Sequence, residues 1–204
     1  KGDLCGAVWE GGGVGGGDVL EPLAAPLAAI QRLIEQFDNR GVIIGGVAAS
    51  LLGRPRLTAD ADVLLLLSVN DIPRLLELAG TVGLQPRLAN AMEFARRNRV
   101  LLLQHVATGI GVDISLGLLP FEVETVERSV EHQVGAVRLR LPTPEDLIIL
   151  KAIAHRPKDM LDIEAVIAAQ EHLDKKRIAS WVRQFADLLE VPELWTDLER
   201  LLRT

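Results

Sequence analysis

The sequence predicts an α+β fold, in which a mixed sheet flanked by helices is followed by a lobe made only of helices. Short apolar segments alternate with helical patterns up to about residue 142, whereas residues 143–204 show helical periodicity alone. The 204 residues are 49% hydrophobic and 25% charged, which is typical of one globular domain with a small appendage. We therefore expect a tail at 1–21, a sheet-based core at 22–142 and a helical lobe at 143–204.

The tail is dominated by glycine, which accounts for eight of the first seventeen residues. Ordering glycine runs costs much conformational entropy, so this segment is predicted to be a flexible tail. The alternative, a phosphate-binding P-loop, requires a Lys followed by Ser or Thr after the glycines. Asp18 and Val19 stand there instead, which excludes that loop.

The core is predicted to alternate between helices and strands. Apolar spacing predicts helices at 22–37, 47–52, 72–82 and 121–130, and strands at 42–44, 60–67, 99–106, 110–116 and 137–141. Ala107-Thr108-Gly109 favours a hairpin between two of these strands. The strand that follows Asp62 is almost continuously apolar, so both of its faces should be covered.

The helical lobe is predicted to begin at Thr143, a residue type that caps helix N-termini, with Pro144 at the first helical position. Pro157 should end this first helix near His155. Further helices are expected at 158–169, 175–189 and 192–202.

Charge and composition exclude several classes of protein. A net charge of −6 argues against a surface that binds polyphosphates all over, so any nucleic acid must meet a local patch. The longest apolar runs, such as 63–67, fall far short of the roughly 20 residues that cross a membrane. The single cysteine, Cys5, cannot form an internal disulfide or a cysteine-based zinc site, and we expect a cytoplasmic protein.

Two carboxylates open one predicted strand. Asp60 and Asp62 stand at i and i+2, so both side chains leave the same face, with Cα atoms about 6.5–7 Å apart. Oxygen ligands that converge in this way suit Mg²⁺ or Mn²⁺, particularly when phosphates complete the shell. The alternative is a capping role at the start of the strand.

A third carboxylate, Asp113, lies inside the second apolar strand. If the two strands are neighbours, it can join Asp60 and Asp62, since a lone buried carboxylate costs several kcal/mol. Three carboxylates around divalent metal form the two-metal arrangement for phosphoryl transfer, in which the third also accepts the proton of the attacking hydroxyl.

Gly45-Gly46 ends a strand and opens a helix, which lets backbone N–H groups approach a triphosphate. Taken alone, the pair is also compatible with a plain turn. Its position just before the Asp pair favours the phosphate-binding interpretation.

These residues resemble the DNA-polymerase-β-like nucleotidyltransferase superfamily. Its pattern of Gly-Gly followed by Arg-x-Thr-x-Asp-x-Asp falls on Gly45, Gly46, Arg56, Thr58, Asp60 and Asp62, with Asp113 at the third acidic position. The likeness is nearest to the AbiEii-type nucleotidyltransferases, the catalytic toxins of some bacterial toxin–antitoxin pairs. It extends into the lobe, where Lys151 is followed by Arg-x-Lys-Asp-x-x-Asp at 156–162, and spans about residues 24 to 170.

The resemblance implies a nucleotidyltransferase core and a role for each matching residue. Gly45 and Gly46 would line the phosphates of a bound nucleoside triphosphate (NTP), with Arg56 and Thr58 in the same nucleotide site, and Asp60, Asp62 and Asp113 would bind Mg²⁺ or Mn²⁺. Lys151 would reach the phosphates or the base, with Asp159 orienting it. One departure is Val47, which replaces the hydroxyl residue that often follows the glycines; Ser50 could substitute for it.

The charged residues of the lobe and core also have plainer interpretations. Lys151 could be a surface lysine, and Asp159 could serve the helix dipole from the first helical turn. Asp162 is predicted to pair with Lys158, four residues earlier. Arg96, Arg97 and Arg99 form the densest basic patch, which is either a solvated face or a contact for acceptor RNA.

Three functions remain open from the sequence. The first is a metal-dependent nucleotidyltransferase that moves NMP from NTP to an acceptor hydroxyl; the AbiEii likeness implies RNA or protein as acceptor and a cognate antitoxin as partner. The second is an aminoglycoside-type adenylyltransferase, whose cationic substrate an acidic protein would suit. The third is a non-catalytic binding or antitoxin module with the same fold, against which the presence of all three carboxylates argues.

Overall fold

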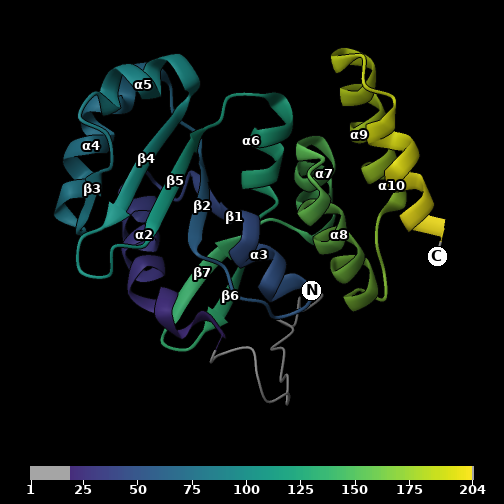
Figure 1. Ribbon diagram of the computed structural model, residues 1–204, viewed down its shortest axis with the longest axis horizontal. Helices are drawn as coiled ribbons and strands as arrows, with labels where there is room; N and C mark the ends of the chain where they lie inside the picture. Colours follow the sequence, from purple (N-terminus) through teal and green to yellow (C-terminus); the bar gives the residue numbers. More distant parts are fainter. Residues whose placement is uncertain (1–18, 204) are drawn as a thin grey trace, which may run out of the picture.

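The computed structural model describes residues 19–203, and its elements follow the predicted order (Figure 1). The strands are β1 (Gly41–Ile44), β2 (Asp60–Leu65), β3 (Leu84–Pro86), β4 (Val100–His105), β5 (Gly111–Leu116), β6 (Val130–Val134) and β7 (Val137–Leu141). The helices are η1 (Glu21–Leu23), α2 (Ala24–Glu35), α3 (Gly45–Leu52), η2 (Val69–Asp71), α4 (Ile72–Thr81), α5 (Ala91–Asn98), α6 (Pro120–Glu127), α7 (Pro144–Ala154), α8 (Pro157–Ala169), α9 (Lys175–Leu189) and α10 (Glu193–Arg203).

A five-stranded mixed sheet in the order β1-β2-β5-β4-β3 forms the centre of the core. Only β2 and β5 are parallel, and every other neighbouring pair is antiparallel. The predicted hairpin between β4 and β5 is confirmed. The predicted α+β fold with a mixed sheet and a helical lobe is also confirmed.

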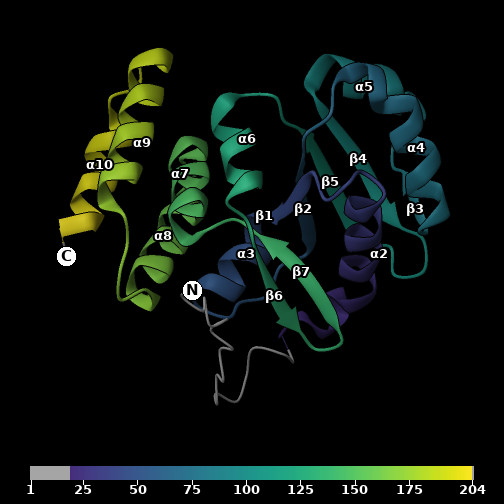
Figure 2. The ribbon, with the colours of Figure 1, turned by 180° about the vertical axis from the view of Figure 1, so that it is seen from behind.

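One face of this sheet is closed and the other is partly open. Side chains of β4 and β5 alternate between fully buried and half-exposed, as expected when only one face lies against the core. The closed face carries Val63 and Ile114 and packs beneath α2, which lies behind the sheet in Figure 1 and in front of it in Figure 2. The prediction that β2 is covered on both faces holds only from Val63 onward, because Asp60 is exposed and Asp62 half-exposed.

On the partly open face, α6 covers the end of the sheet formed by β1 and β2. Val126 packs there with Val42, Leu64 and Leu66 in a small apolar cluster separate from the main core. Leu64 and Leu66 continue the row of side chains that begins with Asp60, so the same face is apolar at one end and acidic at the other.

The helical lobe packs on the core through α3, which contacts both α7 and α8 (Figure 1). Asp146, whose side chain is fully buried, accepts hydrogen bonds from Arg177 of α9 at 2.7 Å and from Arg128, just after α6, at 3.1 Å. Phe121 packs against Trp181, with ring centroids 5.2 Å apart and the ring planes tilted by 55°. Thr143 caps α7 as predicted, because its hydroxyl accepts from the Asp146 amide at 3.2 Å.

Four elements were not predicted from the sequence, namely β3, α5, β6 and the short 3-10 helix η2. The first has only three residues and ends at Pro86, too short for a periodic signal. The predicted helix to residue 130 was wrong at its end, because α6 stops at Glu127 and β6 pairs with β7 around Gly135, whose φ is +56°. The helix α5 ends at Arg99 in a left-handed conformation, without the glycine that usually marks such an end.

The predicted tail falls, up to residue 18, outside the described residues. Its predicted boundary at 21 was too late, because Leu20 is 2% exposed and belongs to the hydrophobic core. Among the helices of residues 19–203, none combines the length and the apolar character needed to cross a membrane.

Candidate active site

The parallel pairing of β2 with β5 brings the three predicted carboxylates to one face of the sheet. Asp62 is the direct register partner of Asp113, and Asp60 is the partner of Gly111. Because side chains alternate along a strand, Asp60, Asp62 and Asp113 leave the sheet on the same side. The predicted convergence of these strand positions is confirmed.

The carboxylates influence one another electrostatically. Burial and the nearby charge of Asp60 raise the pKa of Asp62, against the opposing effects of Arg156 and Lys158. Burial likewise raises the pKa of Asp113; Arg87 lowers it, and the charges of Asp62 and Asp60 raise it further. A cation between these groups would therefore relieve repulsion.

Asp113 already has a partner, because its carboxylate accepts a hydrogen bond from the Arg87 guanidinium. Within residues 19–203, no group of three or more His, Cys, Asp or Glu side chains is arranged to hold a metal ion. The predicted three-carboxylate metal site is therefore not preassembled. Asp60 and Asp62 stand as a pair of carboxylates on the same face of the sheet, next to Asp113.

The glycine pair forms a turn directly over Asp62. Ile44, the last residue of β1, is the register partner of Asp62, and α3 begins at Gly45. Gly45 has a φ of +64°, and a β-carbon there would overlap the Asp62 carboxylate. A β-carbon at Gly46 would lie 2.5 Å from the Thr58 hydroxyl. Both glycines are therefore required where the backbone passes close to the acidic cluster.

Gly45→Ala is expected to displace the Asp62 carboxylate and to destabilise the protein by about 1–3 kcal/mol, through left-handed strain and overlap. Chemical denaturation measures this loss. Gly80→Ala is the matched control, because Gly80 lies in α4 with nothing within 4 Å of an added β-carbon. That variant should be neutral or gain up to about 1 kcal/mol. Equal stability of the two variants would contradict the assigned role of Gly45.

Lys151 lies at the centre of a buried network of charges. Its ammonium donates to Asp159 at 3.1 Å and to Asp162 at 2.6 Å, and its side chain is 5% exposed. The predicted contact with Asp159 is confirmed. The resemblance implied that Lys151 reaches the phosphates or the base, whereas in the structure both acids of α8 enclose its ammonium.

Both acids of this network also bind an arginine at its edge. Asp162 accepts two hydrogen bonds from the Arg56 guanidinium, at 2.7 and 2.8 Å, and Asp159 accepts two from the Arg156 guanidinium, at 2.6 and 3.2 Å. Burial raises the pKa of each acid, but the hydrogen bonds from arginine and Lys151 outweigh burial and lower it. The predicted pair of Asp162 with Lys158 was wrong, because tertiary partners outcompete a helix-surface pair.

Arg56 ties the loop before β2 to α8. Its backbone amide donates to the Ser50 hydroxyl at 3.1 Å, and Ser50 is 4% exposed. Ser50 therefore shapes the loop and does not replace the hydroxyl missing at Val47. Thr58 donates to the Asp60 backbone carbonyl at 3.2 Å, which orders the start of β2. A hollow of about 470 Å³ lies along Arg56, Asp162 and the outer side of α8.

Two cations that act on the carboxylates, Arg156 and Lys158, were not assigned to the site from the sequence. Both act on the charge of Asp62 from the start of α8, and the Arg156 side chain is 58% exposed. They stand inside the Arg-x-Lys-Asp pattern at 156–159, so the signal was present. What the sequence did not show is that these two cations, on either side of Pro157, lie near enough to Asp62 to act on its charge.

The basic patch predicted at Arg96, Arg97 and Arg99 is divided by the fold. Arg99 donates to the Leu116 carbonyl at 3.1 and 2.6 Å, so its guanidinium has a structural role. Arg96 and Arg97 are exposed in the last turn of α5, just before β4 begins opposite Ser115. That end of the sheet lies away from Gly111 and Asp60.

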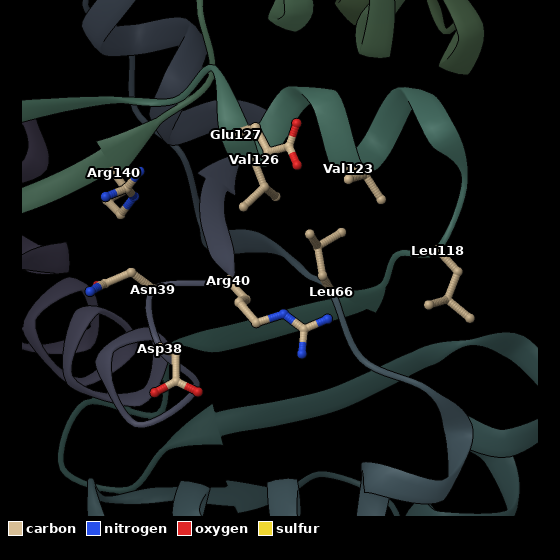
Figure 3. A pocket seen from close by; sticks show the side chains of 9 residues that line it. All are labelled: Asp38, Asn39, Arg40, Leu66, Leu118, Val123, Val126, Glu127 and Arg140. Atoms are coloured by element: carbon tan, nitrogen blue, oxygen red, sulfur yellow. The ribbon is translucent and has the colours of Figure 1, made fainter.

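A second hollow lies at the α6 end of the sheet, with a volume of about 460 Å³ (Figure 3). Leu66 and Val126 form part of its wall, and Arg40 and Arg140 also line it. Leu66 stands four residues beyond Asp62 along the chain that continues β2, roughly 13 Å away at the usual strand rise. This hollow is therefore separate from the carboxylate site.

A family model described as "Nucleotidyltransferase of unknown function (DUF6036)" matches residues 23–187. The chain belongs to this family. The match spans the carboxylates of the sheet, the glycine turn and the charge network of α7 and α8 within one family domain. No curated protein matches the sequence significantly.

Two solved structures show the same fold as this DUF6036 chain. One is the crystal structure of an antigenic nucleotidyltransferase-like protein from Paracoccidioides brasiliensis, with 14% identity, a TM-score of 0.51 and coverage of 89% of this chain and 93% of that one. The other is the solution structure of the antibiotic-resistance factor ANT(2'')-Ia, with 15% identity, a TM-score of 0.53 and coverage of 82% and 95%. These likenesses show the fold, and the family match shows a nucleotidyltransferase family; neither establishes an AbiEii-type subfamily.

Proposed function

We propose that this protein is a metal-dependent nucleotidyltransferase that moves NMP from NTP to an acceptor hydroxyl. The observation that carries the proposal is the placement of Asp60, Asp62 and Asp113 on one sheet face, directly beneath the Gly45-Gly46 turn. A purely structural explanation for this acidic cluster is weak, because Asp is unfavourable in β-strands and like charges repel.

The cations at the start of α8 and the glycine turn form the proposed triphosphate site. Backbone groups of Gly45 and Gly46 line the phosphates, since these two residues have no side chain to keep the phosphates away from the backbone. Arg156 and Lys158 supply positive charge from the opposite side. Lys158 acts as a point charge, which suits phosphate without requiring a fixed geometry.

Mg²⁺ or Mn²⁺ is the proposed cofactor. Mg²⁺ is usually held by one or two carboxylates together with substrate phosphates, and Asp60 with Asp62 fits that requirement. When bound there, the ion would neutralise the charge of the triphosphate. Asp113 completes the set once Arg87 has left its carboxylate.

The proposed reaction is an in-line displacement at the α-phosphorus of the NTP. The acceptor hydroxyl oxygen forms a new bond to phosphorus, the bond to the β-phosphate oxygen breaks, and pyrophosphate leaves. Asp113 accepts the hydroxyl proton, for which its raised pKa makes it a better base. Asp60 and Asp62 would hold the divalent ion that neutralises the charge of the phosphates.

Lys151, Asp159 and Asp162 are proposed as positioning residues. Their buried contacts fix Arg56 and Arg156 at the edge of the site, so the network sets the distance between α8 and β2. This role replaces direct contact of Lys151 with phosphate, which the resemblance implied.

The AbiEii-type likeness supports a finer proposal, in which the protein is the toxin of a toxin–antitoxin pair and acts on RNA or protein. Aminoglycoside-type adenylyl transfer is the second candidate, favoured by the acidic net charge of −6. The two candidates share the chemistry at Asp62 and differ in the acceptor.

Incubation of the protein with each labelled NTP and Mg²⁺ or Mn²⁺ tests the proposed function. We expect transfer of NMP with release of pyrophosphate, and loss of both when the metal is chelated. Lys158→Gln should weaken NTP binding about tenfold without loss of stability, because this exposed lysine faces Asp62 but forms no buried contact. Lys176→Gln, which removes an exposed lysine of α9, is the control. A protein that binds no NTP would refute the proposal.

A further inference from the structure

The partly open face of the sheet continues beyond the carboxylates over β4 and β3. Across one rung, Asp62 is followed by Asp113 and then by Leu102. The neighbouring rung runs from Asp60 through Gly111 and Gln104 to Gln85. The side chains of this face on β4 and β5 are half-exposed, so no helix of the described chain seals them. The site therefore has a floor on which a second substrate can lie, on the side of Asp113 away from the glycine turn.

Arg87, the residue after β3, reaches over this floor to Asp113. The Arg87 backbone amide donates to the Leu102 carbonyl at 3.0 Å. This hydrogen bond continues the pairing of β3 with β4 and places the Arg87 side chain on the partly open face. The guanidinium binds Asp113, and the Arg87 side chain remains 35% exposed. It also lies over Gly111, where an added β-carbon would come within 3.3 Å of its nitrogen. Gly111 thus provides the space in which Arg87 rests.

We propose that this floor is the acceptor site, and that Arg87 binds an anionic phosphate of the acceptor. The inference rests on the proposed function and adds the chemical class of its second substrate. A planar guanidinium binds phosphate through two parallel hydrogen bonds, and here it stands on the side from which a hydroxyl can reach Asp113.

The charges of the floor favour a phosphate-bearing acceptor over a polycationic one. The strands β3 and β4 contain no Asp or Glu, so their part of the floor offers Arg87, two glutamines and apolar surface. A cationic antibiotic lying over β3 and β4 would meet the Arg87 guanidinium, because the carboxylates of this face stand on β2 and β5. Nucleic acid brings the phosphate that this arrangement lacks, and does so despite the acidic net charge because the contact is local.

The same contact explains how Asp113 becomes available. Without an acceptor, Arg87 occupies the carboxylate that the proposed reaction needs as proton acceptor. An acceptor phosphate competes for the guanidinium and draws it away from Asp113. The acceptor hydroxyl then loses its proton to the freed carboxylate while its oxygen bonds to the α-phosphorus and pyrophosphate leaves. Binding of the acceptor phosphate therefore frees the carboxylate that accepts the proton of the acceptor hydroxyl.

Four acceptors distinguish the possibilities: a short single-stranded RNA with a free 3′ hydroxyl, adenosine monophosphate, adenosine and kanamycin. We expect the RNA to be used at least tenfold better than adenosine in kcat/KM, and kanamycin to be the poorest. Preference for the RNA over adenosine monophosphate would show that the bound phosphate belongs to a nucleic-acid strand. Equal use of the two would show that it belongs to a free nucleotide.

Arg87→Gln should raise the KM for RNA about tenfold and should not raise the KM for adenosine, which has no phosphate for the guanidinium to bind. Arg87→Lys should keep part of the preference for RNA. Fluorescence anisotropy of labelled RNA without NTP should show the same tenfold loss of affinity. Gly111→Ala is the second variant, because the added β-carbon would disturb the position of the Arg87 guanidinium without changing the charge of Arg87. Arg97→Gln is the matched control, because Arg97 is an exposed arginine of α5 near the other end of the sheet.

Transfer to adenosine or kanamycin at or above the rate with RNA would overturn the acceptor inference and leave the proposed function intact. Unchanged RNA affinity in Arg87→Gln would overturn it equally. Failure of the protein to bind NTP or to transfer NMP to any acceptor would refute the proposed function itself.

Discussion

Asp62→Asn is expected to lower NMP transfer by about 10³-fold or more, because the substitution removes a proposed metal ligand and its charge from the centre of the site. Electrostatic stabilisation of a transferring phosphoryl group by a bound ion is worth several kcal/mol, and each 1.4 kcal/mol changes the rate about tenfold. The measurement is release of pyrophosphate from labelled NTP at saturating Mg²⁺.

The same variant is expected to be slightly more stable than the native protein at pH 7, by about 1–3 °C in Tm. Burial and Asp60 raise the pKa of Asp62 above its ordinary value of 3.8, so its charged form costs stability in the folded state. This cost is present above the raised pKa and fades as the pH falls through it. The advantage of Asp62→Asn should therefore shrink as the pH is lowered toward 4 and disappear below it.

Asp187→Asn is the matched control for Asp62→Asn, because it removes one negative charge from an exposed position of α9. It should retain native activity and stability. Added Mg²⁺ with NTP should raise the Tm of the native protein and of this control, but not of Asp62→Asn. If Asp62→Asn unfolds the protein or transfers NMP normally, the carboxylate is structural.

Lys151→Met is expected to destabilise the protein by about 3–5 kcal/mol, the usual cost of removing one partner from a buried ion pair. The substitution keeps the apolar stem and leaves two carboxylates without their shared ammonium. Arg56 and Arg156 still bind these acids from the edge of the network, which favours the lower end of the range. Urea denaturation gives the free energy of unfolding, and Tm should fall by roughly 6–15 °C.

Lys176→Met provides the comparison for Lys151→Met, since it replaces an exposed lysine of α9 and should change stability by no more than about 0.5 kcal/mol. Measurement of NTP affinity in Lys151→Met separates the two roles considered for this residue. Unchanged stability with weaker NTP binding would show that Lys151 contacts the nucleotide directly, as the superfamily resemblance implied, and would contradict the positioning role.

Much of the fold could be predicted because its signals are local. The spacing of apolar residues located most of the helices, and Thr143 with Pro144 marked the start of the lobe. The elements that were missed lack such a signal, since β3 has three residues and β6 alternates polar side chains in an exposed hairpin. These two strands are defined by their pairing with β4 and β7, and no periodicity within the short segments themselves signals that pairing.

The candidate site divides in the same way between sequence and structure. Asp60 and Asp62 share a face of one strand because strand geometry has a period of two, and the glycine pair precedes them along the chain. The sequence by itself therefore determined the acidic pair, the turn above it and the presence of a third acid.

Only the tertiary structure decided which partner each charge receives. The pairing of β2 with β5 set Asp113 beside Asp62, and β3 brought Arg87 across the sheet to the same carboxylate. The packing of α8 on the core enclosed Lys151 and turned Asp162 away from Lys158 toward Arg56. The physical reason is that Coulomb energy and desolvation depend on distance and burial in space, and residues separated by dozens of positions in sequence determine both.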